Sequence, residues 1–142
     1  MVGTFVARSS CQCHAELAAA RPIENAHSIW EIVLHVVGWK SVVRQRIEGK
    51  PVRIPEEGDW PAVNDISKSA WRMTLAKLEQ RHDELMKVVQ SLTDERLEDI
   101  LITEHSRETG RGVSCYITLH GVLQHDLYHA GQIALLKKAH PA

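Results

Sequence analysis

The sequence predicts an all-α fold in one domain, built as a small helical bundle. Three segments, at about 29–48, 64–91 and 113–138, carry apolar residues at helical spacing, which is typical of helices that bury one face. A capping motif precedes the first segment, and two lysines close the last one, as suits a helix C-terminus. Since 142 residues suffice for one core, we expect a single domain over residues 1–142.

The first of these helices is expected from Ile29 to Glu48. Ser28 and Glu31 stand in the capping-box arrangement, in which the serine side chain caps the third helical amide while the glutamate reaches back. A proline-rich loop should follow at residues 50–61, because three prolines and a glycine in this stretch disfavour a helix.

Trp60 in this loop has two interpretations. It closes over a binding site as part of a lid, or it caps the core, and we favour the core position.

The second helix is predicted by a heptad pattern. Between about 64 and 91, Trp71, Leu78 and Leu85 trace one buried stripe. Residues 93–111 mix a short helical turn with β-branched and polar residues, so they should form a connection.

The two ends of the chain differ. The last helix should occupy about 113–138 and end in its lysines. At the N-terminus only Ala15 to Ala20 favours helix, so any first helix should be short.

Composition and charge exclude several classes of protein. Seventeen basic residues against eighteen acidic ones give a formal charge of -1 without a long basic run, so we expect no nucleic-acid partner. The apolar runs are too short for a membrane span and the start lacks a signal-peptide pattern, so we expect no membrane association and a cytoplasmic location. Three cysteines, Cys11, Cys13 and Cys115, have no framework spacing and should be free thiols.

Histidine is the unusual residue, with nine copies in the chain. His125 and His129 are four apart, so on a helix they stand one turn apart on the same face, the spacing by which two imidazoles grip one metal ion. That face also carries apolar residues, which turns it towards the bundle. His35 lies in the middle of the first long helix among apolar residues and should face inward too. These three histidines are the candidate ligands of one divalent metal ion.

Other polar residues have a second, plainer interpretation. His82 lies on the buried stripe of the second helix, where a hydrogen-bonded core histidine is favoured over a fourth ligand or a substrate contact. His27 should lie in the entry loop near the site rather than ligate a metal. Glu31 is favoured as the helix cap, with a general base as the alternative. Residues 11–14, Cys-Gln-Cys-His, resemble a metal cluster only superficially, because no matching second half exists.

Residues beside the histidine pair should support it. Gln132 lies about one turn beyond His129 and should hydrogen-bond a bound water or the substrate, while Asp126 and Tyr128 should orient ligands or rim the pocket. Glu31 and Gln132 are therefore the candidate catalytic residues.

Three segments closely resemble the DinB/YfiT-like family of four-helix-bundle metalloproteins. They are His27 to Trp39 (HSIWEIVLHVVGW), Gly58 to Pro61 (GDWP) and Gln124 to Ile133 (QHDLYHAGQI). The resemblance covers about residues 23–139, and the family's metal triad maps onto His35, His125 and His129.

The resemblance implies a bundle with an up-down-down-up type of connection, a central pocket for zinc or nickel, and frequent homodimers. Family members carry a full first helix, whereas about twenty residues precede the match here, so we expect a four-helix bundle with a shortened or irregular first helix. A partner subunit would then cover the apolar surface left open, unless the chain start is truncated. Some relatives resemble low-molecular-weight thiol S-transferases that use bacillithiol or mycothiol, and others look like metal-dependent hydrolases.

Two hypotheses for the function follow. The first is an enzyme that activates a thiol or water on a divalent ion, zinc before nickel, for a small-molecule substrate that includes a low-molecular-weight thiol. The second is a non-catalytic dimeric bundle in which the metal or a small ligand serves stability or stress sensing. Three neutral imidazoles leave coordination positions open, which favours a catalytic over a structural site.

Overall fold

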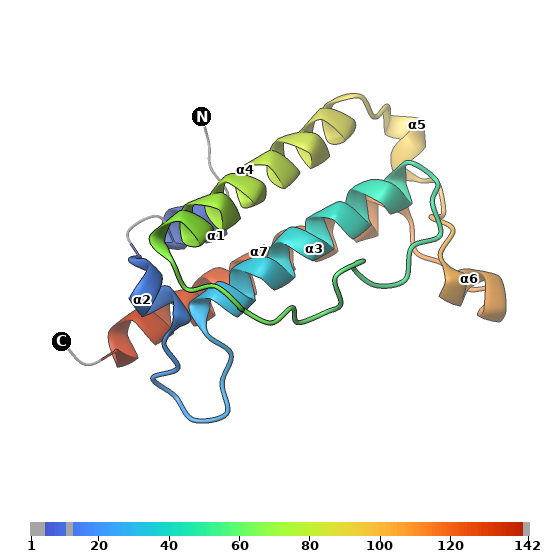
Figure 1. Cartoon of the computed structure of the whole chain (residues 1–142). Coiled ribbons are helices and arrows are strands. Elements are labelled where there is room, and N and C mark those ends of the chain that lie inside the picture. The colour runs from blue at the N-terminus through green and yellow to red at the C-terminus, as the bar shows by residue number, and fades with distance from the viewer. Residues whose placement is uncertain (1–4, 11–12, 141–142) are drawn as a thin grey trace.

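The computed structural model describes residues 5–10 and 13–140, and within these ranges the protein is all-α. Three long helices dominate: α3 (Ile29–Ile47), α4 (Lys68–Gln90) and α7 (Cys115–Ala139) (Figure 1). The described part of the chain also holds four short helices: α1 (Phe5–Ser10), α2 (Ala15–Ala19), α5 (Asp94–Leu97) and α6 (Glu104–Thr109). It forms no strand, only an isolated bridge between Ile100 and Ser114. The all-α prediction is confirmed.

Each long helix begins at a side-chain cap. At α3 the capping box forms as predicted, since Ser28 Oγ accepts the Glu31 amide at 3.2 Å and Glu31 Oε2 accepts the Ser28 amide at 2.8 Å. Helix α4 starts later than the expected residue 64, because Ser67 caps it by accepting the Ala70 amide. Ser114 caps α7 in the same way.

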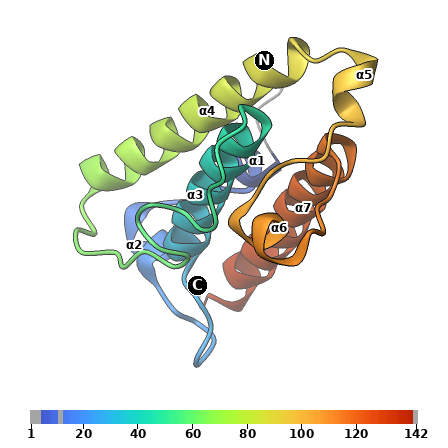
Figure 2. The same ribbon diagram turned by 90° about the vertical axis from the view of Figure 1, so that its right-hand side faces the viewer.

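The core lies on both sides of α3, which packs against α4 and α7 (Figures 1 and 2). One apolar cluster joins the N-terminal half of α3 to α1, α2, α4 and the end of α7, and includes Trp30, Trp71, Leu78 and Ile133. A second cluster lies at the other end, beneath the 93–111 connection. The two clusters thus hold the middle of α3 against the middle of α7.

The N-terminal part is short and broken, as the sequence predicts. Helix α1 has six residues and α2 has five. Helix α1 packs against α7 and reaches α4 at one end of the molecule. At the other end α4 and α7 leave a hollow between them that no helix of the described residues fills. Its lining includes Met86, Leu119 and Leu123.

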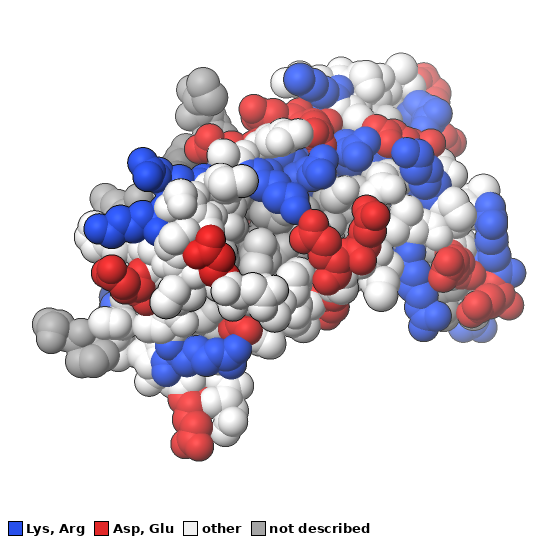
Figure 3. Space-filling view, in the orientation of Figure 1, with Lys and Arg blue, Asp and Glu red and all other residues white. Residues whose placement is uncertain are grey.

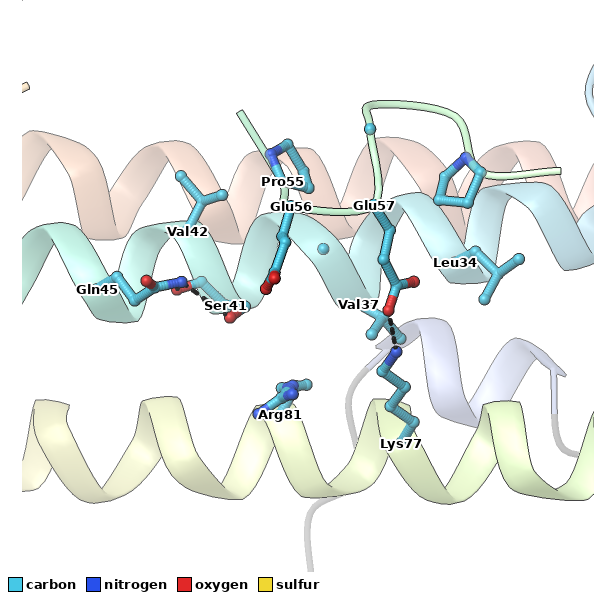
Figure 4. A pocket seen from close by; sticks show the side chains of 13 residues that line it. Leu34, Val37, Ser41, Val42, Gln45, Pro55, Glu56, Glu57, Lys77 and Arg81 are labelled. Atoms are coloured by element: carbon cyan, nitrogen blue, oxygen red, sulfur yellow. Dashed lines mark hydrogen bonds and ion pairs between the residues drawn. The ribbon is translucent and has the colours of Figure 1, made fainter. Parts of the chain in front are cut away.

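The loop after α3 lies close along that helix. A Cβ at Gly38 would stand 2.8 Å from Pro55 Cβ, so only glycine lets the loop approach this closely. Figure 4 shows the loop residues Pro55 and Glu57 over α3, with Glu57 reaching Lys77 of α4 at 2.8 Å. The predicted loop is confirmed, and its course carries residues 59 and 60 towards His35.

No helix among the described residues is long and apolar enough to cross a membrane. On the face shown in Figure 3, basic and acidic side chains lie next to one another rather than in separate fields.

Candidate metal centre

The structure brings the three predicted histidines together. His35 on α3 faces His125 and His129 on α7. The Nε2 atom of His125 lies 2.9 Å from Nε2 of His35 and 3.1 Å from Nε2 of His129. His35 and His129 are buried, with 6% and 4% of their surface exposed, while His125 is half-buried. Three ring nitrogens therefore converge on one point at the α3–α7 interface.

The His35 ring is oriented by the loop. Its Nδ1 lies 2.7 Å from the carbonyl oxygen of Asp59, with the Asp59 carboxylate 3.2 Å away. A carbonyl oxygen only accepts, so Nδ1 carries the proton and Nε2 keeps its lone pair. Trp39, one turn along α3, donates its indole N–H to the Asp59 carboxylate at 2.7 Å and so fixes that carboxylate.

The His129 ring is oriented from its own helix. Its Nδ1 lies 2.7 Å from Gln132 Oε1, and the Gln132 amide nitrogen donates to the Tyr128 hydroxyl at 3.0 Å. The amide oxygen therefore accepts the Nδ1 proton, which leaves Nε2 of His129 with a lone pair. The bond gives Gln132 a role in supporting a candidate ligand, and Gln132 also lines a cleft beside Trp60, so its predicted contact with water or substrate stays a prediction.

His125 differs from the other two histidines. Its Nδ1 is buried and has no hydrogen-bond partner among the described residues. Burial, with the imidazoles of His129 and His35 as further causes, lowers the pKa of His125 to about 4. Burial also lowers the pKa of His129, against an opposing effect of its bond to Gln132. Both rings are thus neutral at pH 7, the form that ligates metal ions.

The donor set fits a divalent transition metal. The Nε2 lone pairs of His35 and His129 are both directed at Nε2 of His125. Lone pairs repel one another unless a proton or a cation lies between them. The three ligand atoms all lie within 4.8 Å of one another, and nitrogens around a tetrahedral zinc ion stand roughly 3.4 Å apart. Imidazole suits zinc, nickel, copper and iron alike, so the set defines the kind of ion but not its identity.

Trp60 covers this centre. Its indole stacks on His35 at 4.0 Å between ring centroids and on His27 at 3.7 Å, with both pairs of rings nearly parallel. The side chain is 37% exposed, so the interpretation of Trp60 as a core residue was wrong, and the lid position is the one observed. His27 lies near the site without joining the triad, as the sequence predicts.

The remaining candidates lie elsewhere. Glu31 is engaged in the cap and in a contact with Arg21, which supports the capping role over that of a base. His82 is half-buried, and its Nδ1 has no hydrogen-bond partner among the described residues, which does not match the favoured role as a hydrogen-bonded core histidine. Asp126 pairs with the buried Lys40 at 2.5 Å and lines the hollow between α4 and α7 rather than either cleft beside the triad.

The cysteines form no metal cluster in the described part of the chain. Cys13 and Cys115 are buried free thiols, and burial raises the pKa of both. Cys11, the other half of the superficial cluster, lies outside the described residues.

Sequence reasoning missed Asp59, Trp39 and Lys40. Asp59 lies within the GDWP segment, and its place beside Trp60 in a proline-rich loop was the one available signal. Trp39 stands one turn after His35, a spacing that also marks the inward face.

Two clefts adjoin the centre. One, of about 310 Å³, lies beside Trp60 and has a largely apolar lining that includes His27, Gln132 and Leu135. The other, of about 300 Å³, lies between α3 and the N-terminal half of α7 and is lined in part by His125 itself. The centre is therefore accessible from outside the core.

The fold and this site define an all-α protein with a three-histidine candidate metal centre. The model of the DinB superfamily matches residues 12–133, which is most of the chain, so the protein belongs to the DinB superfamily. A search of curated proteins and a search of solved structures found no match.

Proposed function

We propose that this protein is a metal-dependent enzyme that binds one divalent transition metal through His35, His125 and His129 and activates a thiol or a water molecule there. The observation that carries the proposal is the convergence of three Nε2 atoms, two of them held in the ligating tautomer. Membership of the DinB superfamily supports it.

The chain's own groups prepare this site for chemistry. Asp59 and Gln132 hold two imidazoles in place, so little reorganisation is needed when an ion binds. Trp60 lies over the His35 ring and shields that side from water. When bound, a divalent ion supplies Lewis acidity, which lowers the pKa of a coordinated water or thiol.

Three neutral ligands leave the charge of the ion uncancelled and its other positions open, as in catalytic sites. We propose zinc first and nickel second, with a small-molecule substrate of the low-molecular-weight thiol type. A thiol S-transferase and a hydrolase both fit this arrangement. A cytoplasmic location remains part of the proposal.

Elemental analysis of the purified protein tests the metal site. We expect one transition-metal ion per chain, lost in His35→Ala and retained in His120→Ala, which removes an exposed histidine of the same helix as the pair. Absence of a stoichiometric metal in the wild type, or retention of it in His35→Ala, would contradict the site.

A thiol panel tests the reaction. The metal-loaded protein is offered monochlorobimane with several cellular thiols, and conjugation that depends on the metal is expected with at least one of them. If no thiol is conjugated, the protein is not a thiol S-transferase of this type. The hydrolase hypothesis is then tested with ester and amide substrates.

A non-catalytic dimeric bundle is the second candidate. The observation that favours it is the outer face of α7, where large apolar side chains such as Leu123, Leu127 and Leu135 are about half exposed or more. In this alternative a second copy packs on this face, and the metal serves the stability of the dimer or stress sensing instead of catalysis. Metal binding without turnover of any substrate offered would favour this alternative.

A further inference from the structure

We propose that the cleft beside His125 binds the body of the substrate, and that this substrate is an anion: a molecule with an apolar middle and a carboxylate that meets Arg46. The inference rests on the proposed function, because it assumes that the reacting end of the substrate lies at the triad metal. It adds a substrate class and a recognition residue to that function.

The cleft runs from the triad along α3 and α7. His125 lines one part of it, and Arg46 lies two turns beyond Trp39 on α3, which is about 10 Å along the helix axis. The full lining is Trp39, Val43, Arg46, Val113, Ile117, Thr118, Gly121, Val122 and His125. These residues combine a candidate metal ligand with a permanent cation in one cleft of about 300 Å³.

Arg46 is held in place without an anionic partner. Its Nε donates to the Val52 carbonyl at 2.8 Å and its Nη2 to the Arg53 carbonyl at 2.7 Å, while its Cζ lies 5.7 Å from the Trp39 ring centroid. No Asp or Glu of the described residues forms an ion pair with it. Arg44, by contrast, is paired with Glu48 at 2.8 Å. Arg46 is thus a fixed guanidinium whose charge is not cancelled.

The electrostatics of the cleft favour an anion. Its lining contains no acidic side chain. Arg46 is partly buried, and this burial lowers the pKa of its guanidinium. The guanidinium offers a planar donor set that suits a carboxylate, and its Nη1 makes no hydrogen bond with the described residues. A carboxylate of the substrate would supply the anionic partner that Arg46 lacks.

The walls between the two ends are apolar. Val113 is 48% exposed and Ile117 is 56% exposed, and Val43 and Val122 lie deeper. Gly121 leaves open space, since a Cβ built on it meets no atom within 4 Å. An apolar segment of a ligand would bury these side chains, so the cleft suits an aliphatic or aromatic body rather than a sugar.

The second cleft lacks this combination. The lining beside Trp60 contains neither a Lys, an Arg nor a triad histidine. Of these two clefts, the α3–α7 cleft alone combines a triad histidine with a cation, so it is the one that selects for a charged substrate.

Cobalt(II) protein tests the inference by spectroscopy, without any assay of turnover. The probes are ω-mercaptoalkanoic acids of increasing chain length, each beside the ω-mercaptoalkanol of the same length. The thiol releases its proton to the buffer when it coordinates, and the thiolate-to-cobalt charge-transfer band reports binding. We expect the acids to bind about tenfold more tightly than the alcohols at one preferred chain length, as a charge-assisted hydrogen bond allows.

Variants assign the preference to the cleft. Arg46→Gln should bring the acid-to-alcohol affinity ratio close to one while the alcohols still bind, and Arg46→Lys should keep part of the preference. Arg44→Gln is the matched control and should leave the ratio unchanged, because Arg44 is paired with Glu48 and Glu84 and does not line the cleft.

Gly121→Leu gives an independent test that leaves the loop contacts of Arg46 intact. It places a side chain in the open part of the cleft and should weaken both long-chain series, with an unchanged cobalt spectrum and oligomeric state. Gly121→Ala carries the same gain in helix propensity with only one methyl group and should leave binding nearly as in the wild type.

The outcomes separate the two proposals. If the protein takes up no cobalt, or the thiols give no charge-transfer band, the proposed function fails and the inference fails with it. If thiols coordinate but acids and alcohols bind equally, or if the preference survives Arg46→Gln, the inference is overturned while the metal site stands.

Discussion

At the scale of single residues, the centre depends on which nitrogen of each imidazole holds the proton. The Asp59 carbonyl and the Gln132 amide each accept an Nδ1–H, so two lone pairs are directed to the same place before any ion arrives. His125 has no such partner, and its neutrality comes mainly from burial. The orientation of the imidazole rings and their neutral state therefore have different causes, so separate substitutions can remove each of them.

The first prediction concerns pH and the metal-free protein. The folded-state pKa of His125, about 4, lies below the ordinary value of 6.5, so between these values the unfolded chain binds a proton that the folded chain does not. The contribution of His125 to the free energy of unfolding should be fully present above pH 6.5 and should be lost as the pH drops towards 4. The contribution of His125 is on the order of 2–3 kcal/mol, allowing for its partial exposure.

Urea unfolding of the metal-free protein at a series of pH values measures this slope. His125→Gln should flatten it between pH 6.5 and 4, with a residual slope from His129, whose pKa burial also lowers. An identical slope in the wild type and the variant would show that His125 is not the group responsible.

The second prediction concerns the support of a ligand. Gln132→Ala removes the acceptor of the His129 Nδ1 proton and should weaken metal affinity by about 10- to 100-fold, as is usual for such partners. Competition with a chelating dye measures the affinity. Gln124→Ala changes an exposed glutamine of the same helix and should have no effect; equal affinities for the two variants would exclude a role for Gln132.

At the scale of elements, a buried ion pair holds α3 to α7 beside the triad. Lys40 is 2% exposed, and its ammonium contacts the Asp126 carboxylate, whose other oxygen is buried without a hydrogen-bond partner among the described residues. Lys40→Met would leave a buried carboxylate uncompensated and should lower the free energy of unfolding by about 3–5 kcal/mol. Chemical denaturation measures the loss.

The double variant Lys40→Met/Asp126→Leu is the control for this pair. It replaces both charges by apolar groups and should recover most of the loss, because neither charge is then left buried alone. A double variant as unstable as Lys40→Met would indicate that packing, rather than the charge, causes the loss.

The close approach of the loop to α3 gives a further prediction. A Cβ at Gly38 would stand 2.8 Å from Pro55 Cβ and 2.9 Å from its Cγ, so Gly38→Ala should displace the loop at a cost of about 1–3 kcal/mol. The displacement should also weaken metal binding, because the loop carries Asp59. Thermal denaturation and the chelator competition measure both effects. Gly131→Ala, on open space in α7, should instead be neutral or stabilising by up to about 1 kcal/mol.

Local patterns in the sequence predicted the elements well, because helix caps and apolar spacing act over a few residues. The capping box placed the start of α3, and the i, i+4 spacing placed His125 and His129 on one face. The meeting of His35 with this pair was expected from its inward position and from the family resemblance, whereas the contacts of the loop after α3 could not be predicted. Nothing near residue 59 indicates that its carbonyl meets an imidazole 24 residues earlier, and Trp60 was misplaced for the same reason. The shared cause is a loop whose path depends on a tertiary contact at Gly38.

At the scale of the whole molecule, α7 is apolar on all sides, a property typical of buried helices. Its outer face nevertheless lies open. The exposed large apolar side chains along α7 are Tyr116, Ile117, Leu123, Leu127, Tyr128 and Leu135, of which Ile117 and Leu135 also line the clefts beside the centre. Between residues 115 and 136 the only charged residue is Asp126, which is buried, so two copies meeting on this face would encounter no like-charge repulsion.

We therefore predict a homodimer with a two-fold axis across α7. Leu127, 47% exposed, lies in the middle of the outer face, and Leu127→Lys would bury two ammonium groups at the contact and shift the mass in solution from dimer to monomer. Light scattering after size exclusion, over a range of concentrations, measures that mass. Met73→Lys, at a 72% exposed position on α4, should remain dimeric. A wild type that stays monomeric at the highest concentration reached would refute the dimer, and dissociation in both variants would place the contact elsewhere than on α7.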